Sequence, residues 1–423
     1  MELLVATVYV LLFVALLLKL PFFADQTVQR PWWVAAFLVK LGCGFFFMLV
    51  YQYRYHEGGD ALTYFTAGKT IYDTLHLNPL YFLELTFGAN ARKPPEHLIA
   101  IIDGIPSWND VRSYTAIRVN ALAHLISFHY YSVHIILGTF LSFLGLTGIY
   151  RCFCLFFPQL RKWFFAAVFG LPSVLFWTSG LHKEGISLLC MGMIMYLFFY
   201  ALLHKFTLKL TISLLVWCAL LALIRPYTLG LLLPALAVAW VVKRFTLPAM
   251  PTFLLLYGAG YFALSVLSLV SDKLNIFAKL AEIRYYFVMY KLGGSDINLS
   301  LLPPTWYHTL LDMPMSLANA LLRPEPWGNT DMMHIVAAAE TLCLTLLLLV
   351  GLLFNRLRQT PFAYFWLACL FFIITSLLLI GLTTDNLGAI VRYRSILMPV
   401  WLGFWVVAAL GGKNNHEQPA KLL

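Results

Sequence analysis

The stretch Pro361–Leu382, PFAYFWLACLFFIITSLLLIGL, has 22 residues and no charged side chain. A helix that crosses the hydrocarbon core of a bilayer needs about 20 mostly apolar residues, so this stretch predicts a transmembrane helix. Similar runs recur along the chain, in which 61% of the residues are hydrophobic and only 11% are charged. The composition therefore predicts a polytopic membrane protein and excludes an ordinary soluble domain.

About eleven apolar runs, each bounded by charge, Pro or Gly, predict an all-α fold, a bundle of transmembrane helices. The predicted spans are 2–20, 32–53, 132–150, 163–180, 185–203, 210–224, 227–242, 251–270, 335–354, 361–382 and 395–411. Two long loops and a tail separate the groups of spans. The expected parts are two N-terminal helices (1–53), a first outer loop (54–131), central helices (132–270), a second outer loop (271–334), C-terminal helices (335–411) and a tail (412–423).

The short loops show a charge asymmetry that predicts the orientation. On one side, twelve basic residues stand against only two acidic ones, Asp25 and Glu417. Because basic loops stay on the cytoplasmic side, this side is predicted to be cytoplasmic. The net charge of +10 is then mostly a topogenic signal, and no basic run is left over that favours nucleic acid as a partner.

Most of the carboxylates fall on the opposite, outer side, and the first of them follow the second span in His56–Phe65, HEGGDALTYF. The paired glycines predict a turn that places Asp60 in the first turn of a surface helix. Asp60, helped by Glu57, can act as a general base toward an acceptor hydroxyl. Alternatively Glu57 and Asp60 hold a divalent cation, Mg or Mn, with His56 as a ligand or orienting donor, or Asp60 is simply solvated. No metal or other cofactor is firmly indicated.

The helix predicted over 61–77 has an apolar face, which favours a position at the membrane interface. Five large apolar residues lie roughly along this face. They are Leu62, Phe65, Ile71, Tyr72 and Leu75.

Cations occur at three later outer reversals, where the topology gives no reason for them. Lys183, in the turn Trp177–Gly185, is the first candidate for a phosphate contact, with Glu184 pairing with it or orienting it. Arg225 faces the same side. Arg392 and Arg394 suit a bidentate grip on a phosphate or diphosphate. The alternatives are a surface Lys-Glu pair for Lys183 and a snorkelling or salt-bridged pair with Asp385 for the last two arginines.

The turn Arg323–Thr330, RPEPWGNT, is rigid, aromatic and charged. Its prolines restrict the backbone, and Trp327 with Glu325 can stack on and hydrogen-bond a sugar ring, flanked by Arg323. The same residues can equally cap a helix bundle.

Gly59-Asp60 followed by Tyr64-Phe65 opens a large outer loop, and cations follow on the later outer reversals. This arrangement resembles the GT-C superfamily of integral membrane glycosyltransferases, which includes dolichyl-phosphate-mannose-dependent mannosyltransferases and the aminoarabinose transferase. One further span precedes the acidic motif than is usual in that family, and its paired-acid form is absent. Three stretches also look like uncharacterised bacterial membrane proteins of the glycosyltransferase or polysaccharide-polymerase type: Phe176–Glu184, Arg323–Trp327 and Asn386–Arg394.

The resemblance implies an enzyme of a bacterial cytoplasmic membrane with its active face outside. A sugar would pass from a polyprenyl-phosphate or polyprenyl-diphosphate carrier to a glycan, lipid or protein acceptor. The family's loop carboxylate matches Asp60, as a base or an acceptor binder, and His56, Tyr64 and Asp385 are further substrate contacts to expect. The alternatives are a polymerase or ligase of lipid-linked polysaccharide, a non-catalytic assembly subunit, and a transporter of lipid-linked glycans.

Overall fold

The computed structural model describes residues 1–53, 59–88, 94–291, 295–327, 331–353, 357 and 360–411. In this part of the chain every named element is a helix, which confirms the predicted all-α fold class. An antiparallel bridge joins Asp296 to Asn386. By its internal contacts the chain divides into two compact units, Met1–Cys152 with Val174–Leu229, and Phe153–Ser173 with Gly230–Leu423.

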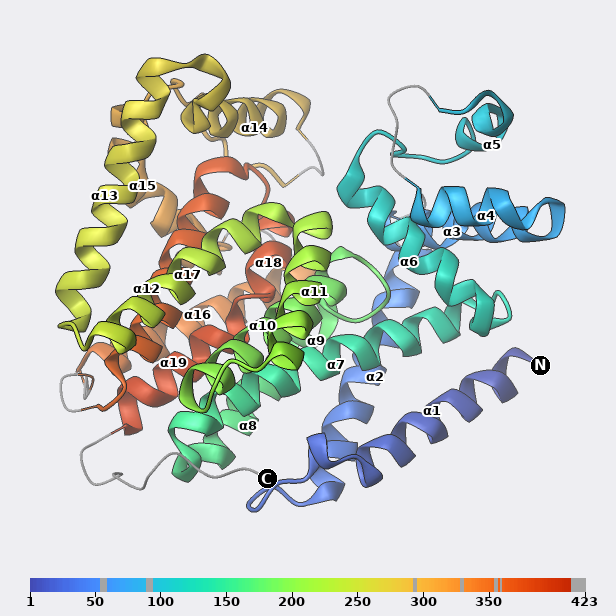
Figure 1. Cartoon of the computed structure of the whole chain (residues 1–423), viewed down its shortest axis with the longest axis horizontal. Coiled ribbons are helices and arrows are strands. Elements are labelled where there is room, and N and C mark those ends of the chain that lie inside the picture. The colour runs from blue at the N-terminus through green and yellow to red at the C-terminus, as the bar shows by residue number, and fades with distance from the viewer. Residues whose placement is uncertain are drawn as a thin grey trace. The chain divides into compact units, whose positions relative to one another are not determined.

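Figure 1 labels the α-helices in chain order. The helices that lie wholly or mainly in the first unit are α1 (Glu2–Lys19), α2 (Arg30–Tyr53), α3 (Gly59–Leu77), α4 (Pro79–Phe87), α5 (Ile99–Ile102), α6 (Val111–Ser127), α7 (Tyr131–Phe156), α9 (Pro172–Trp177), α10 (Lys183–Leu203) and α11 (Leu208–Ile224). Those of the second are α8 (Arg161–Phe169), α12 (Pro226–Phe245), α13 (Ala249–Val270), α14 (Ile276–Tyr290), α15 (Trp306–Leu322), α16 (Met332–Leu353), α17 (Ala363–Thr383), α18 (Leu387–Ser395) and α19 (Met398–Leu410). Short 3-10 turns stand at Pro21–Phe23, Glu96–Leu98, Pro158–Leu160 and Asp272–Leu274.

Seven helices of the described part are long and apolar enough to cross a membrane, namely α1, α2, α7, α10, α12, α13 and α17. Helices α18 and α19, bent by 64° to one another, can form an eighth span. Helix α11 and the segment Met332–Leu347 of α16 are apolar but shorter. The prediction of a polytopic helical membrane protein is thus confirmed, whereas the number of eleven spans is not.

The predicted span 163–180 is wrong as a continuous helix. Two short helices, α8 and α9, stand there instead, separated by Gly170 and Leu171. Pro172 explains the break, because proline lacks the N–H that a helix needs and disfavours the helical conformation in the residue before it. Helix α9 ends at Trp177, and the Thr178–His182 segment then leads into α10.

Helices α7 and α10 approach each other closely within the first unit. A Cβ atom on Gly145 of α7 would lie 2.4 Å from the carbonyl oxygen of Leu188 in α10, and a Cβ atom on Gly138 would lie 2.1 Å from the carbonyl carbon of Gly180, in the segment that leads into α10. Further along α7 and α10, a Cβ atom on Gly148 would lie 2.7 Å from the carbonyl oxygen of Gly192. In these contacts, later residues of α7 meet later residues of α10, so the two helices run parallel. The chain between the end of α7 and the start of α10 must therefore return to the end of the unit where α7 starts.

Replacing Gly138 by alanine tests this packing. Gly138→Ala is expected to lower the free energy of unfolding by about 1–3 kcal/mol, because the added methyl overlaps backbone atoms that cannot rotate away. Thermal unfolding of the full chain in detergent measures the effect. Gly42→Ala on α2 is the control, since nothing lies within 4 Å of a Cβ there. Equal unfolding temperatures for the two variants contradict the close contact.

The two ends of the first unit carry different parts of the chain. At one end Arg151, near the end of α7, donates a hydrogen bond of 3.0 Å from Nη2 to the carbonyl oxygen of Phe22. Two loops that were assigned to the same side from their charge therefore lie together. At the other end the ring of Phe47, late in α2, lies 5.1 Å from the ring of His182. Helix α3 and the start of α10 are found at this second end.

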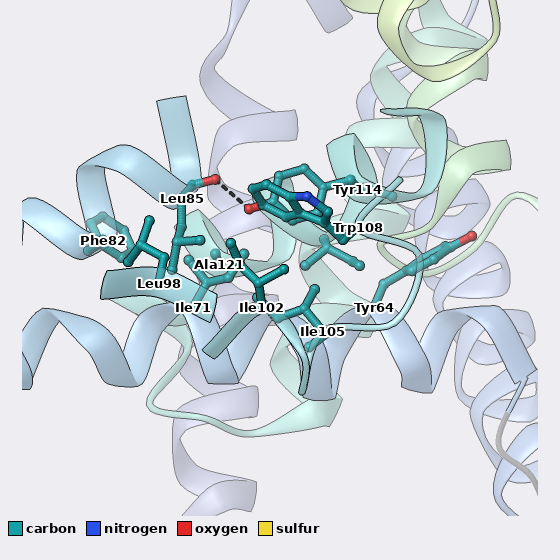
Figure 2. Close-up of a cluster of buried hydrophobic side chains, with 13 residues drawn as sticks. Tyr64, Ile71, Phe82, Leu85, Leu98, Ile102, Ile105, Trp108, Tyr114 and Ala121 are labelled. Carbon is teal, nitrogen blue, oxygen red and sulfur yellow. Dashed lines mark hydrogen bonds between the residues drawn. The ribbon is translucent and has the colours of Figure 1, made fainter. Parts of the chain in front are cut away.

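Helices α3 to α6 form a small helical layer with its own hydrophobic cluster (Figure 2). Helix α3 confirms a helix over 61–77, and its position at the membrane interface stays a prediction. A Cβ on Gly68 would lie 2.8 Å from Asn120 Cβ, so only small residues allow α6 to approach this closely. Leu62, Phe65, Tyr72 and Leu75 are half-buried. The buried residues of α3 are Ala61, Tyr64, Ala67, Gly68, Ile71 and Thr74.

Candidate functional site

The start of α3 places Asp60 in the first helical turn, as the paired glycines predicted. Gly59 has a φ of 54°, and a Cβ there would lie 2.2 Å from the ring of Tyr51. Glycine is required at this position because both the backbone conformation and the space exclude a side chain. The half-buried Asp60 follows it directly. His56 and Glu57 lie outside the described residues, and their roles stay predictions.

Tyr64 connects the start of α3 to α6 and α10. It lies four residues after Asp60, which places both side chains on the same side of the helix. Figure 2 shows its ring at the edge of the hydrophobic cluster, with the hydroxyl pointing away from the other labelled residues. That hydroxyl lies 3.5 Å from Ser113 Oγ. Lys183 Nζ donates to the same Ser113 oxygen at 3.1 Å and lies 5.5 Å from the centre of the Tyr64 ring.

The structure thus brings Tyr64, Ser113 and Lys183 together and places Asp60 four residues, about 6 Å along the helix axis, from Tyr64. Tyr64 and Ser113 are buried, while Lys183 and Asp60 are half-buried. These four residues are called the Lys183 cluster below. Of its members, Ser113 was not predicted, because nothing in the sequence around 113 signals that α6 packs against α3.

Asp110 caps the start of α6 and adds a carboxylate beside this cluster. Ser113 Oγ donates to its Oδ2 at 2.7 Å, and Arg112 Nε donates to its Oδ1 at 2.9 Å. Burial raises the pKa of Asp110, but the hydrogen bonds from Arg112 and Ser113 and the positive charges of Arg112 and Lys183 outweigh it and hold the pKa below its ordinary value. Asp110 therefore stays ionised at neutral pH and keeps the Ser113 hydroxyl oriented.

Glu184 and Arg225 form a buried ion pair next to Lys183. Arg225 Nη2 donates to Glu184 Oε1 at 2.5 Å, and both side chains are 3–4% exposed. Glu184 Oε2 lies 3.2 Å from His182 Nδ1. The sequence left open whether Glu184 pairs with Lys183 or orients it. In the structure Glu184 pairs with Arg225, and this ion pair connects the end of α11 to the start of α10. The phosphate role of Arg225 stays a prediction.

In the second unit, Arg394 is almost wholly buried, at 2% exposure. Its Nη1 donates to the carbonyl oxygens of Arg323 (2.7 Å) and Ala320 (3.2 Å), and its Nη2 donates to Thr341 Oγ1. A phosphate at Arg394 would have to replace these backbone contacts at the end of α15. Its role as a phosphate ligand is therefore a prediction that competes with an observed structural role.

The other predicted residues of the second unit are spread over three settings. Arg323 Nη1 lies 3.4 Å from Glu325 Oε1, and Trp327 is 84% exposed. Asp385 is buried and accepts a hydrogen bond of 2.8 Å from the backbone N–H of Leu299. It forms no ion pair with a described arginine, so the alternative in which it neutralises the last two arginines is wrong. The guanidinium of Arg392 lies 5.7 Å from the centre of the Tyr393 ring.

No group of three His, Cys, Asp or Glu side chains within the described ranges is arranged to hold a metal ion. The proposed pairing of Glu57 with Asp60 around Mg or Mn lies partly outside those ranges. Metal dependence therefore stays a prediction for the start of α3.

Comparisons with known proteins find no matching family model, no similar curated protein and no similar solved structure. The resemblance to the GT-C superfamily thus rests on the residues quoted above. The grounds for a function are the membrane-capable helices and the Lys183 cluster.

Proposed function

We propose that this chain is a membrane glycosyltransferase that moves a sugar from a polyprenyl-phosphate or polyprenyl-diphosphate carrier to a glycan, lipid or protein acceptor. The observation that carries the proposal is Lys183, the first residue of α10, which lies beside the Ser113 hydroxyl and the ring of Tyr64. Tyr64 in turn lies four residues after Asp60 on α3. An ammonium at the start of a long apolar helix is suited to the phosphate of a lipid whose tail lies among the helices.

The chemistry needs a cation for the leaving phosphate and a base for the acceptor hydroxyl. In the Lys183 cluster these are Lys183 and Asp60. The acceptor hydroxyl oxygen attacks the anomeric carbon while the bond from that carbon to the carrier phosphate breaks, and the phosphate leaves with the electron pair. Lys183 stabilises the charge on the leaving phosphate. Asp60 takes the proton of the acceptor hydroxyl. The charge of the loops supports a reaction on the outer side of the membrane. The resemblance described above supports a bacterial cytoplasmic membrane.

Binding of undecaprenyl phosphate to the full chain in nanodiscs tests the proposal. Lys183→Met is expected to weaken this binding about 10- to 100-fold, the usual worth of one charge-assisted contact to a phosphate. Undecaprenol, which lacks the phosphate, should bind the parent protein as weakly as the variant binds the phosphate. Isothermal titration or intrinsic tryptophan fluorescence measures both.

Lys69→Met on α3 is the matched control, because Lys69 is exposed and pairs with Asp73 at 2.7 Å. It should leave binding unchanged. Two results contradict the proposal. One is equal affinity of the parent protein for undecaprenol and undecaprenyl phosphate, and the other is an unchanged affinity of the Lys183→Met protein for undecaprenyl phosphate.

A further inference from the structure

Lys40 lies in α2, one of the helices able to cross a membrane, and its side chain is fully buried. Its Nζ donates to Thr178 Oγ1 at 2.7 Å and to Ser179 Oγ at 3.2 Å. No ion pair of Lys40 occurs among the residues that the structure describes. A lysine inside an apolar run was itself a signal in the sequence, because ionisable residues within spans are costly and tend to be functional.

The two hydroxyls do not need Lys40 for their own hydrogen bonds. Thr178 Oγ1 donates to the carbonyl oxygen of Val174 at 2.6 Å, and Ser179 Oγ donates to that of Leu175 at 2.5 Å. Lys40 is therefore an additional donor that ties α2 to the start of the Thr178–His182 segment, which follows α9. Burying an ammonium without a carboxylate partner costs free energy. A contribution to stability therefore does not explain why a lysine stands at position 40.

Lys40 also cannot contact a ligand directly, because none of its side chain is exposed. Its effect must pass through the Thr178–His182 segment, which it holds at the first two residues. The next residue of the chain after this segment is Lys183.

The same segment is held from two other helices of the first unit. Asn120 Nδ2, on α6, donates to the carbonyl oxygen of Leu181 at 2.9 Å. His134 Nδ1 lies 2.9 Å from Asn120 Oδ1, and it is the donor because the Asn120 amide nitrogen already faces Leu181. Gly180, with a φ of 96°, packs against Gly138 of α7. Three helices, α2, α6 and α7, thus contact this segment and restrict the position of its end.

We infer that Lys40 is a positioning residue: it fixes the Thr178–His182 segment so that Lys183 points at the phosphate of the lipid carrier. This inference rests on the proposed function for the identity of the ligand. Its physical basis is the contacts of Lys40 within the membrane-spanning region, which are independent of that proposal.

Lys40→Met, a substitution of similar length without the charge, separates positioning from stability. The unfolding temperature of the full chain in detergent is expected to stay the same or rise, because the buried charge is gone. The affinity for undecaprenyl phosphate is expected to fall about tenfold, since the Lys183 ammonium loses its fixed place. Lys19→Met, at the exposed end of α1, is the control and should change neither quantity.

The coupling to Lys183 is measured by combining the two substitutions. In a Lys183→Met protein, Lys40→Met should cause no further loss of affinity, because it acts through Lys183. An equal loss in both backgrounds, or a loss of affinity with a matching fall in unfolding temperature, overturns the inference.

Failure of the proposed function gives a different pattern. If Lys183→Met binds undecaprenyl phosphate normally, the proposed function fails, and hydrogen exchange of the Thr178–His182 backbone then decides on Lys40. Faster exchange in this segment alone in Lys40→Met supports a positioning role. Unchanged exchange overturns it.

Discussion

Asp60→Asn is expected to lower the rate of sugar transfer by about 100- to 10,000-fold while leaving the protein folded. General base catalysis typically supplies a factor of this size, and asparagine cannot take the proton of the acceptor hydroxyl. Asp60 lies in the first turn of α3, so the change should preserve the helix. Transfer from a panel of undecaprenyl-phosphate hexoses in proteoliposomes measures the rate, and circular dichroism checks the helix content.

Asp73→Asn is the matched control on the same helix. Its carboxylate is 49% exposed and pairs with Lys69, so transfer should stay within twofold of the parent rate. Normal transfer by Asp60→Asn would remove Asp60 from the mechanism. Loss of transfer in both variants would show that transfer depends on the total negative charge of α3 and not on Asp60 as a general base.

Arg225→Met is expected to destabilise the protein by about 3–5 kcal/mol, because it leaves the Glu184 carboxylate buried without its charged partner. Both side chains of the pair are 3–4% exposed, and the two groups are 2.5 Å apart. Unfolding of the full chain in mixed micelles by increasing SDS, followed by tryptophan fluorescence, measures the change in free energy.

The double variant Glu184→Leu with Arg225→Met removes both charges and should recover most of the stability. The double variant also tests the predicted phosphate role of Arg225. If it is stable but no longer binds undecaprenyl phosphate, Glu184 or Arg225 contributes to phosphate binding. Lys69→Met, which breaks an exposed pair, should cost at most about 1 kcal/mol. An Arg225→Met protein as stable as this control would show that the buried pair contributes nothing.

Much of the fold follows from local composition. The run 361–382 appears as α17, and the runs beginning at 2 and at 32 appear as α1 and α2, because a span is specified by a continuous series of apolar side chains. The turn before Asp60 was predicted for the same local reason, a glycine at a positive φ. The break at Pro172 was present in the sequence as a signal but was overlooked within an apolar run.

The candidate site was only partly predictable. Asp60, Tyr64 and Lys183 were identified by their residue types and by their place at the ends of spans. Lys40 was overlooked, although a lysine within an apolar run was a signal in the sequence. Ser113 was not predictable, because its contact with Lys183 joins residues 70 positions apart, and the partner of Lys40 at Ser179 is 139 residues away. No periodicity or turn signal reports such distances.

The sequence by itself determined that this protein is helical and has helices long and apolar enough to cross a membrane. These properties depend on composition and on neighbours along the chain. The side of the membrane on which its carboxylates lie stays a prediction. Only the tertiary structure decided that Glu184 pairs with Arg225, that Lys183 lies beside Ser113 and Tyr64, and that the Arg394 guanidinium holds backbone carbonyls. Ion pairs and hydrogen bonds act over a few ångströms, so they depend on which helices pack together.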